Sequence, residues 1–463
     1  MRTAPGTSDR PPVNLLIVKQ HLVAAVVFFT LALFAGLLYS AQFLQAYPFK
    51  NTPWLSPGRV RMVHTNLIAY GFICNAFLGG MYWAVPRLTG VSVYSDKFAT
   101  LIFRVWQAVV VATFVGLLCG QAQAVTWGET PIWVDPVVVF VVILVAVQFL
   151  YSIIKTPVRS RHVTLGYFSV ALLWAGPIYI MGNYTPQFLV PGTDGAVIIG
   201  WFTHHLVGLF VTSIGWGLMY FFLPVMLKKS IHSDALSRAG LWGLVFFYPM
   251  LGILHVLGSL MFARYVAVIS TLGIEILVST VIVNFFLTLR GHGAMLKTNI
   301  PIRWFTLGMV FYFMTSLQRL FQVSPTYQAL TRFTDWGVGQ SHLVMFGVFG
   351  FWMLGMVTHL WPMLVGADWY SDTLDAWTFW LSGLGMFVMF FDLVTAGLVQ
   401  GFLWRSLAPW EDSVVVSMPF WYLRAFAGGM IVVGNLLFVA NMILTARGRT
   451  RPHGDTEYVA ASA

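Results

Sequence analysis

The sequence predicts an all-α integral membrane protein with about twelve transmembrane helices. Hydrophobic residues make up 58% of the 463 positions, charged residues make up 9%, and the mean hydropathy is +0.78, which together exclude an ordinary soluble domain. About twelve apolar runs reach the roughly 20 residues that a helix needs to cross a bilayer core of about 30 Å. A transmembrane barrel requires alternating segments of about ten residues, whereas these runs are continuously apolar.

The apolar runs are joined by short connections, which predicts one membrane domain over residues 1–463, with helices between 14 and 446 and a short cytoplasmic tail at 447–463. The first run follows a polar start and is too long for the core of a signal peptide, so we expect an uncleaved first helix. The expected spans, in order, are 22–46, 61–86, 98–123, 131–154, 163–183, 195–227, 237–262, 265–289, 302–324, 336–365, 376–402 and 418–446.

The placement of lysine and arginine predicts the orientation of these spans. If both termini are cytoplasmic, most of the basic residues fall in inner loops and tails, as the positive-inside rule requires. The net charge of +10 is then a consequence of topology and does not indicate nucleic-acid binding. We expect a multi-pass protein of a bacterial-type inner membrane. The basic residues left in the outer loops are Lys50, Arg59, Arg61, Arg264, Arg332 and Arg405.

Five histidines fall inside the apolar spans, where polar side chains are costly and commonly functional. Each of them alone is more simply explained as a packed, hydrogen-bonded helix residue. With the predicted orientation, however, all five lie at one depth near the outer leaflet, which favours a single layer of cofactors. They are His64, His204, His205, His255 and His342.

Four segments around these histidines carry a family resemblance. They are residues 58–66 (GRVRMVHTN), 201–208 (WFTHHLVG), 334–336 (TDW) and 400–405 (QGFLWR). They resemble subunit I of the haem-copper oxidase superfamily, in particular the C-family (cbb-type) cytochrome c oxidases and the large subunit of nitric oxide reductase. The resemblance covers nearly the whole chain and implies the twelve-transmembrane-helix subunit I fold.

The resemblance implies a low-spin haem b held by two histidines, which correspond to His64 and His342. Two imidazoles fill both axial positions of the iron, which suits outer-sphere electron transfer and leaves no open coordination site. Arg59 and Arg61, at the outer end of the same helix, are candidates to bind the haem propionates. Interfacial arginines exposed to solvent are an equal alternative for this pair.

At several positions where the family has catalytic metal ligands, this chain has a different residue. The ligand of the high-spin haem should be a histidine two residues before His342, where this chain has Gln340, and an amide oxygen is a poor iron ligand. The copper ligand on helix 6 matches His204, but the histidine pair on helix 7 aligns with Leu254 and His255. His204, His205 and His255 remain candidates for a residual copper site, with simple packing as the alternative.

Three further family positions also differ. The tyrosine expected at the start of helix 7 is absent from residues 232–234, and the glutamate expected on helix 9 is replaced by Gln318 and Arg319. The glutamate that nitric oxide reductases use on helix 6 corresponds to Gly208. Two acids lie deep within helices, Glu275 and Asp392, and each is a candidate partner for Arg319 or Arg424.

These differences favour a membrane b-type cytochrome that acts as an electron-transfer subunit of a respiratory complex and does not itself reduce oxygen. The alternatives are a divergent terminal oxidase or nitric oxide reductase catalytic subunit, with a second haem, and a haem-free membrane scaffold. The chain has no Cys-x-x-Cys-His motif, so any covalent haem must belong to another chain. We therefore expect cytochrome c or a membrane-anchored c-type cytochrome subunit as a partner, together with other subunits of the complex.

Overall fold

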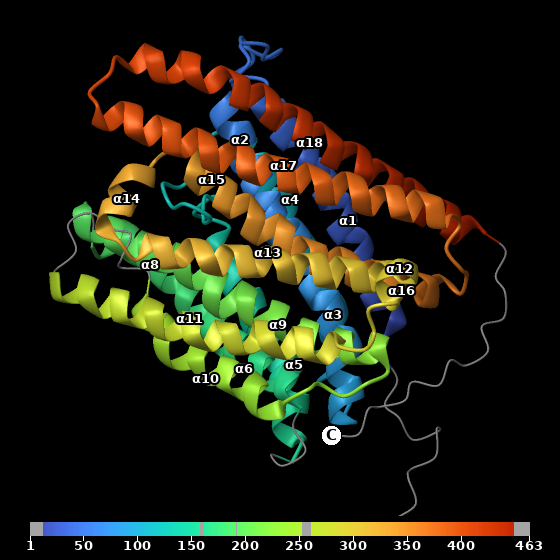
Figure 1. Cartoon of the computed structure of the whole chain (residues 1–463). Helices are drawn as coiled ribbons and strands as arrows, with labels where there is room; N and C mark the ends of the chain where they lie inside the picture. The colour runs from blue at the N-terminus through green and yellow to red at the C-terminus, as the bar shows by residue number, and fades with distance from the viewer. Residues whose placement is uncertain (1–12, 158–161, 191, 252–260, 449–463) are drawn as a thin grey trace, which may run out of the picture.

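The computed structural model describes residues 13–157, 162–190, 192–251 and 261–448, and these residues form a bundle of tilted helices (Figure 1). Eleven of the described helices are long and apolar enough to cross a membrane. The twelfth span is expected at 237–262. Its first part forms α10 (Asp234–Phe247) and the short turn η5 (Tyr248–Met250), and residues 252–260 are not among the described residues. The predicted helical membrane architecture is confirmed.

The helices that could cross a membrane follow the expected order. They are α1 (Leu15–Ser40), α2 with η2 and α3 (Pro57–Asn66, Leu67–Ile73, Cys74–Thr89), α4 (Asp96–Leu118), α5 (Asp135–Lys155), α6 with α7 (Val163–Asn183, Thr185–Phe188), α8 with η4 and α9 (Thr193–His205, Leu206–Thr212, Ser213–Leu227), α11 (Met261–Leu289), α13 (Ile300–Gln322), α15 with η7 and α16 (Asp335–His342, Leu343–Gly350, Phe351–Val365), α17 (Asp372–Arg405) and α18 (Trp410–Arg447). Short helices η1 (Pro53–Leu55), α12 (Met295–Thr298) and α14 (Pro325–Thr331) lie in connections.

Three long helices form the centre of the bundle, and each is interrupted by a π-helical segment. These segments are η2, η4 and η7, and the helices that contain them are the most buried of the eleven. The remaining helices surround them and expose apolar side chains such as Val27, Ile143 and Ile276, as lipid-facing surfaces do. π-Helical turns are rare and occur frequently at functional sites. Each of the three begins directly after a helix that carries a predicted ligand histidine in its last turn.

Local sequence explains where the central helix α15 begins. Thr334 is extended, and its hydroxyl accepts a hydrogen bond from the backbone N–H of Trp336, which caps the first turn. Asp335 follows in that first turn, where a carboxylate is favoured by the helix dipole. Its side chain is held by α17 and α18, because Gln400 Nε2 and Trp421 Nε1 both donate to it, at 2.7 Å and 2.9 Å. The start of the helix that carries Gln340 and His342 is therefore fixed.

Candidate haem site

His64 and His342 face each other across a cavity, although they lie in distant segments of the chain. Their ring centres lie 6.1 Å apart and their planes differ by 23°. The Nδ1 atom of His64 lies 2.7 Å from the carbonyl oxygen of Ala32, and that of His342 lies 2.8 Å from the carbonyl oxygen of Val338. An Nδ1 bonded to a carbonyl carries the proton, which leaves the lone pair of Nε2 free to bind a metal.

The geometry of this pair fits two axial ligands of one haem iron. A metal–nitrogen bond is about 2 Å long, and the ring centre lies roughly 1 Å further out, so two axial imidazoles place their centres about 6 Å apart. The observed separation of 6.1 Å agrees with this sum. Among the described residues, each ring forms its hydrogen bond through Nδ1, and neither Nε2 has a hydrogen-bond partner. The donor set, its orientation and its spacing all suit a haem.

The cavity between the two histidines has a volume of about 510 Å³ and is lined mainly by apolar side chains. Its walls come from α1, α2, η2, α15, η7, α17, α18 and the loop between α4 and α5. Gly36 of α1 is required beside the His64 ring, because a Cβ atom at this position would lie 2.7 Å from both Cε1 and Nδ1. A pocket of this size with few polar groups is typical of cofactor sites.

The two arginines predicted to act together are separated in the structure. Arg61 lines the cavity, whereas Arg59 turns away and donates through Nη1 to the carbonyl of Leu118, at the end of α4, at 2.8 Å. Residues two apart on a helix point about 200° away from each other, which explains why both cannot face one cavity. Arg424 of α18 lines the cavity instead, and its Nη1 lies 3.9 Å from Asp335 Oδ1. The sequence indicates Arg424 only as a partner for a membrane acid.

The loop between α4 and α5 supplies a second group that the sequence does not indicate. Glu129 lies in this loop, is buried, lines the cavity and accepts a hydrogen bond of 2.9 Å from Asn66 Nδ2. Burial raises the pKa of this carboxyl above its ordinary value, and the bond from Asn66 offsets part of that increase. Thr126 and Trp127 of the same loop also line the cavity.

Gln340 does not face the histidine pair. Its side-chain amide forms two reciprocal hydrogen bonds with Gln322 of α13, both 3.1 Å long. Each amide thereby uses one donor and one acceptor, and α13 is linked to α15 at this point. The residue at the position of the expected high-spin haem ligand is therefore engaged within the protein, and its chemistry does not fit that role.

A tyrosine and an ion pair lie near the expected copper position. Tyr248 of η5 packs directly against Gly208, and its ring is stacked on His204 with the centres 5.2 Å apart. Arg319 donates to Glu275 at 3.2 Å and to the Tyr248 hydroxyl at 3.4 Å. The predicted partnership of Glu275 with Arg319 is thus present in the structure.

The three candidate copper ligands are only partly described. The ring centres of His204 and His205 lie 6.5 Å apart, and His205 Nδ1 is bonded to the carbonyl of Trp201 at 2.6 Å. His255 and Leu254 lie outside the described residues. Within the described ranges, no group of three or more His, Cys, Asp or Glu side chains is placed to hold a metal ion. The residual copper site stays a prediction.

Comparison with known proteins identifies the family. The model of the family described as cytochrome c and quinol oxidase polypeptide I matches residues 16–431. The chain belongs to this family. It is therefore a subunit I homologue of the haem-copper oxidases, a multi-pass membrane protein whose family implies haem and a complex with other subunits.

Curated relatives extend over nearly the whole of this subunit I homologue. The cbb3-type cytochrome c oxidase subunit CcoN1 of Stutzerimonas stutzeri is 25% identical over 96% of this chain and 95% of its own length. Cytochrome c oxidase subunit 1 of Rhodobacter capsulatus is 26% identical over 87% of this chain and 80% of its own length. A nitric oxide reductase subunit of Stutzerimonas stutzeri is 21% identical over 91% of this chain and 93% of its own length. The predicted family is confirmed.

A solved structure confirms the fold of the homologue. The structure of a heme-copper terminal oxidase dimer superposes with a TM-score of 0.80 and covers 95% of this chain and 85% of that chain. Its sequence identity is 12%, so this likeness concerns the fold alone. The roles of His64, His342, Arg61 and Gln340 stay predictions, now supported by their placement.

Proposed function

We propose that this subunit I homologue is a b-type cytochrome that transfers electrons within a membrane redox complex and does not reduce oxygen itself. One low-spin haem b is held by His64 and His342. A bis-histidine haem supplies outer-sphere electron transfer, since both axial positions are taken. The chain's own residues orient the imidazoles through the carbonyls of Ala32 and Val338, and the apolar walls of the cavity exclude water.

Two arginines that line the cavity suit the acidic groups of a haem. Arg61 and Arg424 line the cavity, and a guanidinium forms strong charge-assisted bonds with carboxylates. Asp335 Oδ1 lies 3.9 Å from Arg424 Nη1, and Asp335 itself accepts hydrogen bonds from Gln400 and Trp421. We assign Arg61 and Arg424 to the binding of propionates, and we give Arg59 a structural role at the end of α4.

The observation that carries the proposal is the pairing of Gln340 with Gln322. A second haem iron needs a basic nitrogen at this position, and the chain offers an amide whose oxygen already accepts a hydrogen bond. The neighbouring position at Gly208 is covered by Tyr248. The electron donor that we propose is a c-type cytochrome subunit on the outer face of a bacterial inner membrane, with both termini of this chain in the cytoplasm.

Haem content and carbon monoxide binding of the purified chain test the proposal. We expect one haem b per chain, low-spin absorbance in both redox states and no carbon monoxide adduct. Substitution His64→Ala or His342→Ala should abolish this spectrum, whereas His232→Ala, in the connection between α9 and α10, should leave it unchanged. A second haem that binds carbon monoxide would favour the divergent oxidase or reductase. A chain that lacks haem would favour the membrane scaffold.

A further inference from the structure

Asp392 of α17 is a buried carboxyl group that haem binding by the two histidines leaves unexplained. Its side chain is buried, and neither of its oxygens has a hydrogen-bond partner among the described residues. The sequence indicates Arg319 or Arg424 as its partner, but Arg319 bonds to Glu275, and Arg424 forms its ion pair with Asp335. An ionisable side chain without a partner is costly inside a membrane and is commonly functional.

Asp392 lies directly behind the wall of the haem cavity. Met389, three residues earlier on α17, lines that cavity, and residues three apart lie on one face of a helix with their Cβ atoms about 5–6 Å from each other. The next residue, Leu393, packs against Gly339 of α15, where an added Cβ would lie 3.0 Å from the Leu393 Cβ. The unpaired carboxyl is therefore close to the helix that carries His342.

Two charged groups act on Asp392 in opposite directions. The helices packed against α17 are α13, α14, α15, η7 and α18, and the charged groups that they place near Asp392 are Asp335 of α15 and Arg424 of α18. Both line the haem cavity. Asp335 is compensated, because Gln400 and Trp421 donate to it at 2.7 Å and 2.9 Å. An added positive charge in the cavity would shift the balance at Asp392 toward the ionised carboxylate.

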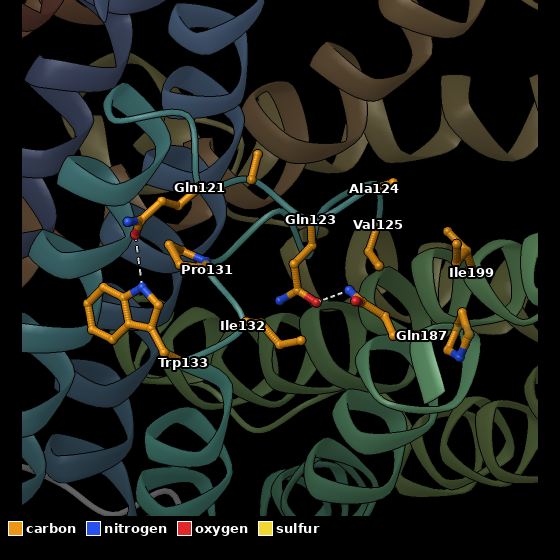
Figure 2. A pocket seen from close by; sticks show the side chains of 11 residues that line it. Gln121, Gln123, Ala124, Val125, Pro131, Ile132, Trp133, Gln187 and Ile199 are labelled. Atoms are coloured by element: carbon orange, nitrogen blue, oxygen red, sulfur yellow. Dashed lines mark hydrogen bonds between the residues drawn. The ribbon is translucent and has the colours of Figure 1, made fainter. Parts of the chain in front are cut away.

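Glu129 is a second acid beside the cavity, and its contacts differ from those of Asp392. Its carboxylate accepts a hydrogen bond of 2.9 Å from Asn66. Its loop is anchored on the far side, since Gln123 donates through its backbone N–H to the Glu129 carbonyl and accepts from Gln187, as Figure 2 shows. Of these two carboxyl groups, Asp392 has the less compensated charge, so it responds more readily to a change of charge in the cavity.

We propose that Asp392 binds a proton when the haem is reduced and releases it when the haem is oxidised. The inference rests on the proposed haem at His64 and His342. Oxidation leaves one more positive charge in the cavity, and this charge stabilises the ionised carboxylate. On reduction, one electron goes to the iron, and one proton goes from water to a carboxylate oxygen of Asp392. The charge of the electron is thereby balanced beside the cavity.

The haem midpoint potential of the purified chain, measured at several pH values, tests the proposal. The potential of the native chain should fall as pH rises, by up to about 59 mV per pH unit, which corresponds to one proton per electron. Asp392→Asn should keep the low-spin spectrum and lose most of this slope, because the amide takes up no proton. Its potential should match that of the native chain at acidic pH, where Asp392 is neutral.

Asp375→Asn is the matched control. Asp375 lies on the same helix, is 3% exposed where Asp392 is 5% exposed, and also has a carboxylate oxygen without a partner. It lies about 25 Å further along α17, at the rise of an α-helix. The control should therefore retain the full dependence of the potential on pH.

The outcomes separate this inference from the proposed function. An equal slope in Asp392→Asn and in the native chain would refute the inference, as would loss of the slope in Glu129→Gln alone. If Asp392→Asn fails to fold, infrared difference spectra decide: the native chain should gain a protonated carboxyl band on reduction, and Asp392→Glu should shift it. A band that is absent or unshifted refutes the inference. A chain without haem b would instead refute the proposed function.

Discussion

Substitution Gly36→Ala should displace the His64 ring and weaken haem binding. The added methyl group would lie 2.7 Å from Cε1 and Nδ1 of His64, whereas non-bonded carbon atoms prefer about 3.5–4.0 Å. The ring must therefore retreat by about 1 Å, against the hydrogen bond of 2.7 Å that holds its Nδ1 to Ala32. Overpacking of this kind costs about 1–3 kcal/mol, which corresponds to a loss of roughly 5- to 150-fold in the population with correct geometry.

Haem b per chain and the low-spin absorbance measure this effect. Gly58→Ala is the matched control, because a Cβ atom at Gly58 meets no atom within 4 Å. We expect the control to bind haem as the native chain does, and Gly36→Ala to bind less haem or to show high-spin character. A fully loaded, low-spin Gly36→Ala protein would refute the assignment of His64 as an axial ligand seated against α1.

Three further perturbations address the groups around the two haem positions. Gln322→Leu and Gln340→Leu should each lower the stability of the fold by about 1–3 kcal/mol, because each leaves a partly buried amide unpaired. The double variant should lose less stability than the sum of the two single variants, as thermal unfolding in detergent can measure. Arg424→Gln should lower the haem midpoint potential by on the order of tens of millivolts in a redox titration, since a nearby positive charge disfavours the ferric state. Burial raises the pKa of Glu129 above 4.5, so the folded state keeps a proton that the unfolded state releases. The free energy of unfolding should therefore fall as pH rises from about 4.5 through the folded-state pKa. Glu129→Gln should flatten this dependence of stability on pH, which melting curves measure.

Hydropathy alone predicts the helical membrane fold, because continuous apolar runs of bilayer length have few other solutions. The pairing of His64 with His342 follows from motifs in two distant segments. The partner of Gln340 does not, since Gln322 lies on another helix in a segment without a motif. Arg424 is similarly hidden, because an isolated arginine in a 38-residue helix carries no pattern that shows which cavity it faces.

Arg59 shows where sequence proximity misleads. Arg59 and Arg61 are close in the chain, which predicts that they act together. Because residues two apart point to nearly opposite sides of a helix, Arg59 bonds to the end of α4 while Arg61 lines the cavity. The same rule separates Gln340 from His342 on α15, where one side chain bonds to α13 and the other faces His64. Periodicity therefore decides which member of a close pair reaches a site, whereas proximity within a motif does not.

The three π-helical segments link the fold to the haem chemistry that we propose. A π turn weakens regular helix geometry and tends to persist where it positions a functional group. η2 and η7 follow the helices that carry His64 and His342 in their last turns, and both imidazoles are free to bind iron. η4 follows His205 in the same way, although there Tyr248 stacks on His204 and covers Gly208. Each π-helical segment thus follows a helix that ends with a histidine, and in the function that we propose two of these histidines hold one haem. A solved structure with only 12% sequence identity shares this fold, so the function that we propose rests on particular side chains, above all on Gln340.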